Sequence, residues 1–111
     1  MSCKVVPTSD FAKDVKRLAK KYKSMRDDLQ EFLGSIAANP LQGVDLGGGI
    51  RKVRIAIKSK DKGKSGGARV ITYNVLTQER EGVVYLITLY DKSEVSTVEI
   101  SIIKEMIRSL E

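Results

Sequence analysis

The side chains in this sequence that could do chemistry are mainly lysines and arginines. They outnumber the acids by 20 to 14, which gives a formal net charge of +6, and there is no histidine. Without histidine, Ser-His and Cys-His nucleophiles and the usual zinc sites are excluded. The carboxylates show no spacing typical of a metal site, so we expect neither a metal nor a cofactor. Catalysis would have to use Lys, Arg, Tyr, Ser or the few acids.

The charge balance and the single cysteine narrow the class of partner and the compartment. An excess of positive charge favours a nucleic acid, an anionic membrane surface or an acidic protein as partner, although some basic proteins bind none of these. Cys3 cannot form an internal disulfide, which suits a reducing cytoplasm. No apolar run is long enough to cross a membrane, and residues 1–10 have no signal-peptide core. We therefore expect a cytoplasmic protein with one domain, 1–111.

The segment "DKGKSGGARVITY", residues 61–73, contains the pattern closest to a known motif. Gly63-Lys64-Ser65 looks like the end of a phosphate-binding loop, but that motif needs a glycine at the position of Lys58 and a helix after the loop. Residues 68–75 are instead rich in β-branched side chains, which predicts a strand. The pattern therefore indicates a mobile basic loop between two strands rather than a nucleotide site.

Apolar stripes at helical spacing predict three helices. The first begins at Thr8 or Ser9 and continues to Tyr22. The second begins at Ser24, which resembles a capping box with Asp27, and stops at Asn39-Pro40. The third opens with a similar pairing of Ser96 with Glu99. Because the first two helices are joined tightly, we expect an antiparallel hairpin.

Four strands are expected, at residues 4–7, 52–58, 68–76 and 83–92. The last is apolar on both faces, which is typical of a central strand covered on both sides. The glycine-rich stretch 41–50 is predicted to be a loop. The element order β-α-α-β-β-β-α then indicates an α+β fold, in which a helical hairpin covers one face of a small antiparallel four-stranded sheet. The C-terminal helix can cover only part of the other face.

The uncovered part of that face is the candidate site. The strand at 52–58 turns three apolar side chains towards the core: Val53, Ile55 and Ile57. Lys52 and Arg54 then point the other way, and we expect Arg69 to lie beside them on this open surface.

The element order and four segments together resemble the RelE/ParE family of bacterial toxins. The segments are "DFAKDVKRLAKKY", "NPLQGVDLGGGIRKVRIAI", "GGARVITY" and "LITLYDKSE", which span nearly the whole chain in order. The resemblance is greatest to the RelE-like branch with a Lys-Gly-Lys-Ser-Gly-Gly loop. It implies the toxin half of a toxin–antitoxin pair. RelE-like members cut mRNA in the ribosomal A site, whereas ParE-like members poison DNA gyrase.

The resemblance also implies site residues. They are the paired basic positions Lys52 and Arg54, the arginine of the "G-x-R-x-x-Y" strand, Arg69, and the basic position after the last strand, Lys92. RelE has a catalytic tyrosine near the start of the last helix, where this chain reads Ser96-Thr97-Val98. Tyr90 lies nearby and is the candidate to replace it.

Metal-independent RNA cleavage suits these residues, because the substrate's own 2′-hydroxyl can be the nucleophile. Lys52, among other cations, is assigned as general base. Arg54 and Arg69 would hold the phosphate, and Lys92 or Tyr90 would assist the leaving group or stack a base. Four loop lysines would grip the RNA backbone: Lys58, Lys60, Lys62 and Lys64. The same lysines could simply be solvated, and Arg69 could form a structural ion pair with Asp91.

Two other functions fit the same sequence. One is a ParE-like gyrase inhibitor without catalytic activity. The other is an inactive basic module that binds only nucleic acid or its antitoxin. Under the leading hypothesis, an endoribonuclease toxin, the partners are the ribosome, mRNA and an acidic antitoxin that binds through an extended or helical segment. The sequence indicates no oligomeric state.

Overall fold

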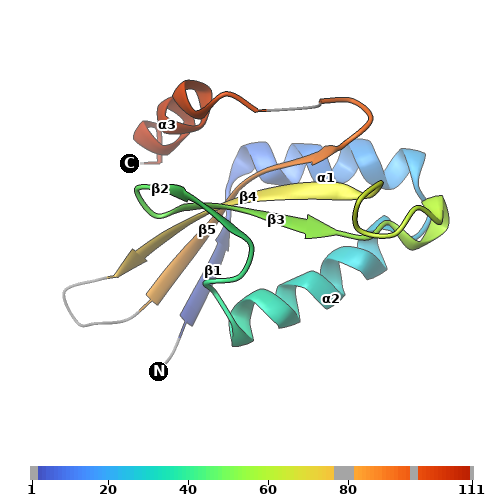
Figure 1. Ribbon diagram of the computed structural model, residues 1–111, viewed down its shortest axis with the longest axis horizontal. Helices are drawn as coiled ribbons and strands as arrows, with labels where there is room; N and C mark the ends of the chain where they lie inside the picture. Colours follow the sequence, from blue (N-terminus) through green and yellow to red (C-terminus); the bar gives the residue numbers. More distant parts are fainter. Residues whose placement is uncertain (1–2, 77–81, 96–97, 111) are drawn as a thin grey trace.

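The computed structural model describes residues 3–76, 82–95 and 98–110 (Figure 1). Within these ranges the chain forms five strands, three α-helices and one short 3-10 turn at Lys58–Lys60. In chain order the elements are β1 (Cys3–Pro7), α1 (Ser9–Lys21), α2 (Met25–Ala38), β2 (Val44–Gly47), β3 (Ile50–Ile55), β4 (Ala68–Leu76), β5 (Gly82–Asp91) and α3 (Ile100–Arg108).

The strands form one mixed sheet in the order β1-β5-β4-β3-β2. β5 is flanked by β1 and β4, so its predicted central position is confirmed. β1 runs parallel to β5, and the remaining neighbours are antiparallel. The α+β class is confirmed, but the expected four-stranded antiparallel sheet is wrong in strand number and in the direction of β1. Side-chain alternation identifies a strand without specifying its neighbour, so the parallel pairing left no signal in the sequence.

The additional strand, β2, lies in the segment predicted to be a loop. It pairs with the first half of β3, and glycines form the turn between the two strands. Gly47, Gly48 and Gly49 all have positive φ angles, of 92°, 62° and 87°. At Gly49 a Cβ atom would also lie 2.8 Å from the carbonyl oxygen of Asn74. The glycines therefore mark a hairpin turn in this segment, where composition had indicated a loop.

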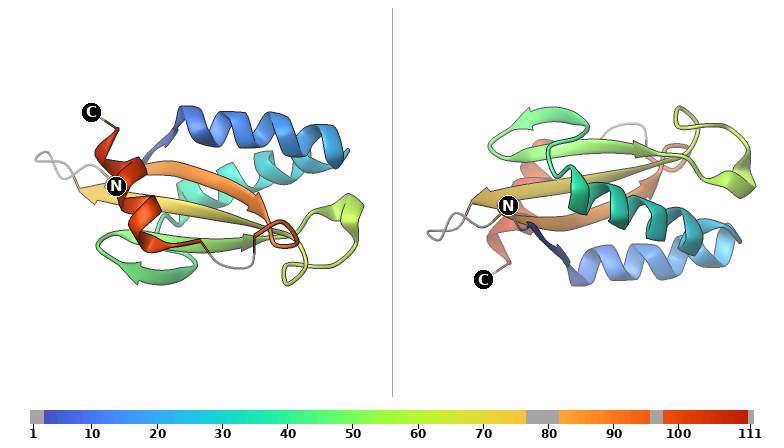
Figure 2. Two further views of the ribbon diagram at one scale, coloured as in Figure 1. Left: turned by 90° about the horizontal axis from the view of Figure 1, so that it is seen from above. Right: turned by 90° about the horizontal axis from the view of Figure 1, so that it is seen from below.

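Helices cover both faces of the sheet (Figure 2). α1 and α2 form the expected antiparallel hairpin on one face, above a core that includes Leu18, Phe32 and Leu86. α3 lies on the opposite face above a smaller cluster with Ile87 and Ile103. No helix in the described ranges is long and apolar enough to cross a membrane. α3 covers only part of its face of the sheet. The part next to the loop between β3 and β4 has no described helix above it, and the predicted site residues lie towards that part.

Of the three helix caps predicted from the sequence, one is present as predicted. Thr8 caps α1, since its Oγ1 accepts a hydrogen bond of 3.2 Å from the backbone N–H of Phe11. Ser24 makes no side-chain cap bond, because its hydroxyl donates instead to Asp28. Of the third pair, Ser96 lies outside the described residues, and α3 begins at Ile100.

Candidate catalytic surface

Three adjacent strands bring the candidate residues into one row. In the sheet register Arg54 on β3 lies opposite Arg69 on β4, and Arg69 lies opposite Tyr90 on β5. Directly paired residues of antiparallel strands point to the same face and are close neighbours. Lys52 lies two residues before Arg54 and therefore shares its face. The predicted face for Lys52 and Arg54 follows from the buried positions of Val53 and Ile55 between and beside them.

A β-bulge in β5 is needed to bring Tyr90 into this row. Leu86 packs in the core under α1 and α2, and in regular alternation Tyr90, four residues later, would face the same way. Ile87, however, has no register partner on β4 and is an extra residue in the strand. This insertion reverses the alternation, so Tyr90 joins the cluster under α3 and lies beside Arg69. The sequence gives no sign of the bulge because both faces of β5 are apolar there.

Arg69 is buried, with 4% of its surface exposed, so its expected place on an open surface was wrong. Its guanidinium donates hydrogen bonds to the carbonyl oxygens of Lys64 (2.9 Å), Ser65 (3.1 Å) and Ala68 (3.1 Å). No described carboxylate forms an ion pair with it, so the alternative of an ion pair with Asp91 was also wrong. Arg69 therefore links the basic loop to the sheet by hydrogen bonds. Its positive charge lies beneath that loop and is not balanced by a carboxylate of the described residues.

The neighbours of Arg69 affect its electrostatics. Burial, together with the positive charge of Arg54, lowers the pKa of Arg69, whereas Tyr90 acts in the opposite direction. An arginine stays protonated in proteins, so the shift signals that burial first, and then the neighbouring charge of Arg54, disfavour the charge of Arg69. An anion between Arg54 and Arg69 would relieve that repulsion. The pair is therefore suited to bind a phosphate.

Tyr90 is buried as well, with 5% of its surface exposed, and packs in the cluster that contains Ile103. This packing leaves little of the ring free to stack on a base. Burial raises the pKa of the Tyr90 hydroxyl, and the charge of Arg69 offsets part of that shift. The hydroxyl is therefore protonated at neutral pH and can act as a hydrogen-bond or proton donor.

Asp91, the residue after Tyr90, forms a second buried polar centre. Its carboxylate is fully buried and accepts hydrogen bonds from the Lys60 amine (2.7 Å), the Tyr22 hydroxyl and the Ser93 backbone N–H (3.0 Å). Burial alone would raise the pKa of Asp91, but these hydrogen bonds outweigh it and hold the pKa well below its usual range. Asp91 thereby joins the end of β5 to the basic loop and to the end of α1.

The four loop lysines that were expected to grip RNA divide into two pairs. Lys60 is bound to Asp91, and Lys58 forms an ion pair of 2.9 Å with Glu31 on α2. Lys62 and Lys64 are exposed, and neither forms an ion pair within the described part of the chain. Only this second pair has amines available to a partner without breaking an existing contact.

The loop itself is attached to the rest of the fold at several points. The Ser59 backbone N–H donates to the Ser24 hydroxyl (2.8 Å), and the Lys92 N–H donates to the Gly67 carbonyl (3.1 Å). At Gly67 a Cβ atom would lie 2.1 Å from the Ile55 carbonyl oxygen, so only glycine allows this close approach. The loop leads into β4, which excludes the helix that a nucleotide-binding loop requires.

The remaining candidates lie at the edges of the row. Lys52 is half-buried on β3, and Lys92 is exposed just beyond β5. Within the described ranges no three Cys, Asp or Glu side chains are grouped so that they could hold a metal ion. Ser96 and Thr97, in the segment where the resemblance implied a tyrosine, lie outside the described residues. The arrangement offers cations and a phenol as the reactive groups.

Comparison with known proteins agrees with this architecture. Residues 9–111 match the family described as "RelE toxin of RelE / RelB toxin-antitoxin system". The fold is also similar to that of the Escherichia coli toxin RelE, solved as a double arginine-to-alanine mutant in the free state. The TM-score is 0.59 over 100% of both chains, at 13% sequence identity. At that identity the structural match shows the fold alone, whereas the family match covers nearly the whole chain. The chain therefore belongs to the RelE toxin family, the toxin half of RelE/RelB toxin–antitoxin systems.

Proposed function

We propose that this toxin is a ribosome-dependent endoribonuclease that cleaves mRNA without a metal ion. Membership of the RelE family implies the toxin function and an antitoxin partner. The observation that carries the cleavage chemistry is the adjacent pair Arg54 and Arg69, to which no described carboxylate is bound. The pair lies beside a protonated tyrosine. Such a row can neutralise a phosphate and supply a proton to it.

The two arginines have different roles in the proposed reaction. Arg54 is exposed and would contact the scissile phosphate directly. Arg69 is held rigidly by three carbonyl oxygens and would act as a fixed positive charge beneath that phosphate. Preorganised charge of this kind stabilises the additional negative charge that develops as the 2′-hydroxyl attacks.

The proton transfers are assigned to residues on either side of the arginines. Lys52 would take the proton from the 2′-hydroxyl, and Tyr90 would give one to the departing 5′-oxygen. Lys92, exposed beyond the end of β5, would bind the RNA chain on the Tyr90 side. With so few acid–base groups, the ribosome would have to position the message, and naked RNA would be cut poorly.

The antitoxin is proposed to be an acidic protein that covers the same row. The positive charges of Arg54 and Lys52 are available to carboxylates of an extended or helical segment, and folding of that segment on binding could cover a large surface. The affinity should then fall as the salt concentration rises. A pull-down from the native host that returns no small acidic partner would contradict this assignment.

Expression with parallel readouts tests the proposed function. The protein and its Arg54→Ala variant would be induced in bacteria, with mRNA ends and DNA breaks measured in the same cultures. We expect cleaved messages for the unmodified protein and at least about 100-fold fewer for the variant. DNA breaks with intact messages would indicate a gyrase inhibitor, and neither outcome would indicate a module that only binds. Arg26→Ala, an exposed change on the opposite side of the sheet, is the matched control.

A further inference from the structure

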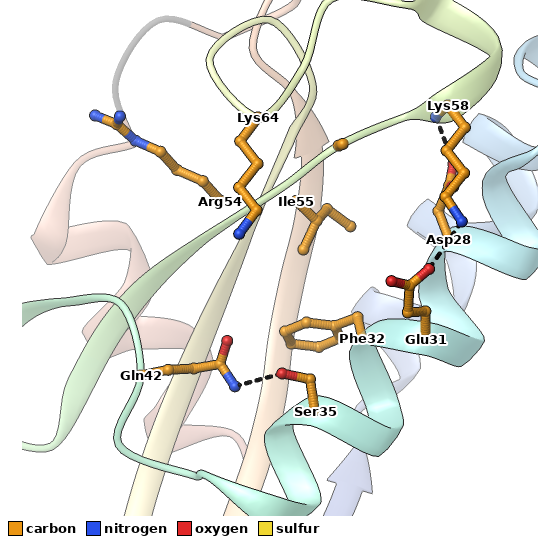
Figure 3. A pocket seen from close by; sticks show the side chains of 10 residues that line it. Asp28, Glu31, Phe32, Ser35, Gln42, Arg54, Ile55, Lys58 and Lys64 are labelled. Atoms are coloured by element: carbon orange, nitrogen blue, oxygen red, sulfur yellow. Dashed lines mark hydrogen bonds and ion pairs between the residues drawn. The ribbon is translucent and has the colours of Figure 1, made fainter.

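We infer that a cleft between β3 and α2 binds one base of the RNA strand, adjacent to the arginine row (Figure 3). The inference rests on the proposed function, because it assumes a single-stranded RNA substrate. It goes further by assigning a base-binding site on the side of β3 that faces the helical hairpin.

The cleft exists because β2 is shorter than β3. β2 pairs with β3 only as far as Lys52, so the β3 edge from Val53 onwards has no strand beside it. The space between that edge and α2 has a volume of about 150 Å³ and an apolar wall formed by Phe32 and Ile55. Sites that enclose whole small molecules typically measure about 300–1,000 Å³. This cleft is suited to one ring system whose remaining atoms lie outside.

Cations stand at the end of the cleft near the basic loop. Figure 3 shows the Lys64 amine directed into the space between β3 and α2, whereas the Arg54 guanidinium points away from it. Arg54 therefore lies between the cleft and Arg69, its partner on β4. A nucleotide with its base in the cleft would place its phosphate near Lys64 and Arg54, which continues the path of the strand held by the row.

Neutral polar groups line the other end. The Gln42 side-chain amide donates a hydrogen bond of 3.0 Å to the Ser35 hydroxyl (Figure 3). It also donates one of 3.1 Å to the Asn39 carbonyl. Gln42 keeps its own carbonyl oxygen available, and both side chains can reorient to meet a base edge. Unpaired RNA bases are commonly read through such contacts to their exposed edges.

Asp28 supplies an independent sign of a missing partner. It lines the cleft, is 95% buried, since only 5% of its surface is exposed, and its Oδ1 atom accepts no hydrogen bond within the described residues. Its other oxygen is satisfied by the Ser24 hydroxyl (2.7 Å) and the Lys58 backbone N–H (3.2 Å). A buried carboxylate oxygen without a donor is costly, so a ligand N–H group there would be favoured.

The cover over Asp28 can open at little cost. Lys58 and Glu31 lie beside Asp28 and form an ion pair in which the side chains are 66% and 70% exposed (Figure 3). Exposed pairs of this kind contribute little to stability. Separation of the pair would let the amino group of a base approach Oδ1.

These groups favour a nucleotide over other anions. Asp28 and Glu31 would repel a free phosphate or an acidic peptide placed against α2, whereas a base brings N–H donors and an apolar ring. Adenine, cytosine and guanine carry an exocyclic amino group that can donate to Asp28, whereas uracil has only its ring N3–H, which is flanked by two carbonyl oxygens that Asp28 and Glu31 would repel. The cleft should therefore prefer those three bases to uracil.

Binding of four RNA hexamers (A6, C6, G6 and U6) to the full-length protein tests the inference. Affinity would be measured by fluorescence anisotropy, and the Gln42 side-chain amide would be followed by NMR. We expect U6 to bind about three- to tenfold more weakly than the others, the effect of one weakened hydrogen bond. Bound A6 should shift the Gln42 signal.

Two variants separate the cleft from general RNA affinity. Gln42→Ala should weaken A6 binding about three- to tenfold, since the change removes one edge contact. Asp28→Asn keeps an oxygen for Ser24 and Lys58 and places an amide donor at the unpaired position, so it should reduce the discrimination against U6. Lys104→Ala, exposed on α3, should leave all four affinities unchanged.

Some outcomes would overturn the inference alone. Equal affinities for the four hexamers with an unmoved Gln42 signal would contradict it, even if the protein cuts mRNA and the proposed function holds. Base preference without mRNA cleavage in the expression test would support the cleft while contradicting the proposed function. If a hexaglutamate peptide shifts the Gln42 signal more than any RNA, the occupant is an acidic protein segment and the inference fails.

Discussion

Asp91 and Arg69 are both buried and charged, and they are close neighbours in the sheet. Asp91 is the last residue of β5, and Arg69 is the second residue of the antiparallel strand β4. In the register Asp91 pairs with Ala68, the residue just before Arg69. Asp91 receives an ammonium group, a phenol and a backbone N–H, so its charge is neutralised where it lies. Arg69 receives only neutral carbonyl oxygens. The charge of Asp91 is therefore balanced by its neighbours, whereas the charge of Arg69 has no described anion beside it.

This difference indicates which of the two buried charges stabilises the fold and which one is available to a ligand. A paired buried charge fixes the geometry around it and offers nothing to a ligand. An unpaired cation beside a second cation costs stability in the free protein, and that cost is recovered when an anion binds. Asp91 should therefore matter mainly for stability and Arg69 mainly for activity.

The largest expected effect is on stability, at Asp91. Asp91→Asn should lower the free energy of unfolding by about 3–5 kcal/mol, because it leaves the Lys60 ammonium, only 16% exposed, without its partner. Urea unfolding followed by circular dichroism measures the change. Asp45→Asn, at a carboxylate that is 66% exposed, is the matched control and should cost less than about 1 kcal/mol.

The effect of Asp91 should also depend on pH in a defined direction. Its pKa is lowered in the folded state, so its contribution is complete above its unfolded pKa of about 3.9 and is lost as the pH falls towards the folded value. The stability difference between the unmodified protein and Asp91→Asn should be constant above about pH 5 and shrink below about pH 4. A difference that grows on acidification would contradict the assignment.

Next in size is the effect of Arg69 on activity. Arg69→Lys keeps a charge but loses the planar fork that contacts Lys64 and Ser65, and Arg69→Ala also loses the charge. We expect mRNA cleavage to fall about 100- to 1,000-fold in Arg69→Ala and less in Arg69→Lys. The fraction of folded protein would be measured for each variant. If the loss of folded protein accounts for the entire loss of cleavage, Arg69 is structural in the same sense as Asp91.

A smaller effect is expected at Tyr90. Tyr90→Phe keeps the packed ring in the α3-side cluster and removes only the hydroxyl. Cleavage should fall about 100-fold if that hydroxyl donates the proton to the leaving oxygen, with little change in the melting temperature. Single-turnover cleavage on programmed ribosomes measures the chemical step. Unchanged cleavage would remove Tyr90 from the mechanism.

The smallest expected effect is on RNA binding, and it should differ between two of the loop lysines, Lys62 and Lys58. Lys62→Ala should weaken binding to single-stranded RNA and reduce the slope of log affinity against log salt by about 0.7, the value for one phosphate contact. Lys58→Ala should leave the salt slope nearly unchanged, because its amine is paired with Glu31 and makes no phosphate contact in the proposed complex. Equal losses in the two variants would show that the ion pair does not distinguish them.

Much of the fold could be predicted from the sequence, because helical stripes and strand alternation follow from local burial. The direction of β1 and the existence of β2 could not, since each depends on pairing with a distant strand. The bulge at Ile87 is also invisible in sequence, because the residues around it are apolar on both faces. Without that bulge Tyr90 would face the helical hairpin.

The candidate site shows a similar division. Strand alternation suggested Lys52, Arg54 and Arg69, and the family resemblance suggested Tyr90. The register brings the last three into one row. The ion pairs of Lys58 and Lys60 form with carboxylates 27 and 31 residues away, so a basic run in the sequence could not distinguish them from Lys62 and Lys64. The burial of Arg69 was missed for a different reason: its acceptors are backbone carbonyls, which every residue carries and no residue type reveals.

The chemistry of the newly formed RNA ends tests the central claim most directly. If the row of cations and Tyr90 assists attack by the 2′-hydroxyl, one fragment carries a 2′,3′-cyclic phosphate and the other a free 5′-hydroxyl. Fragments from a translating extract would be labelled with a polynucleotide kinase without prior phosphatase treatment. We predict direct labelling, which requires a 5′-hydroxyl. A 5′-phosphate on the primary product, the usual result of two-metal hydrolysis, would contradict the account.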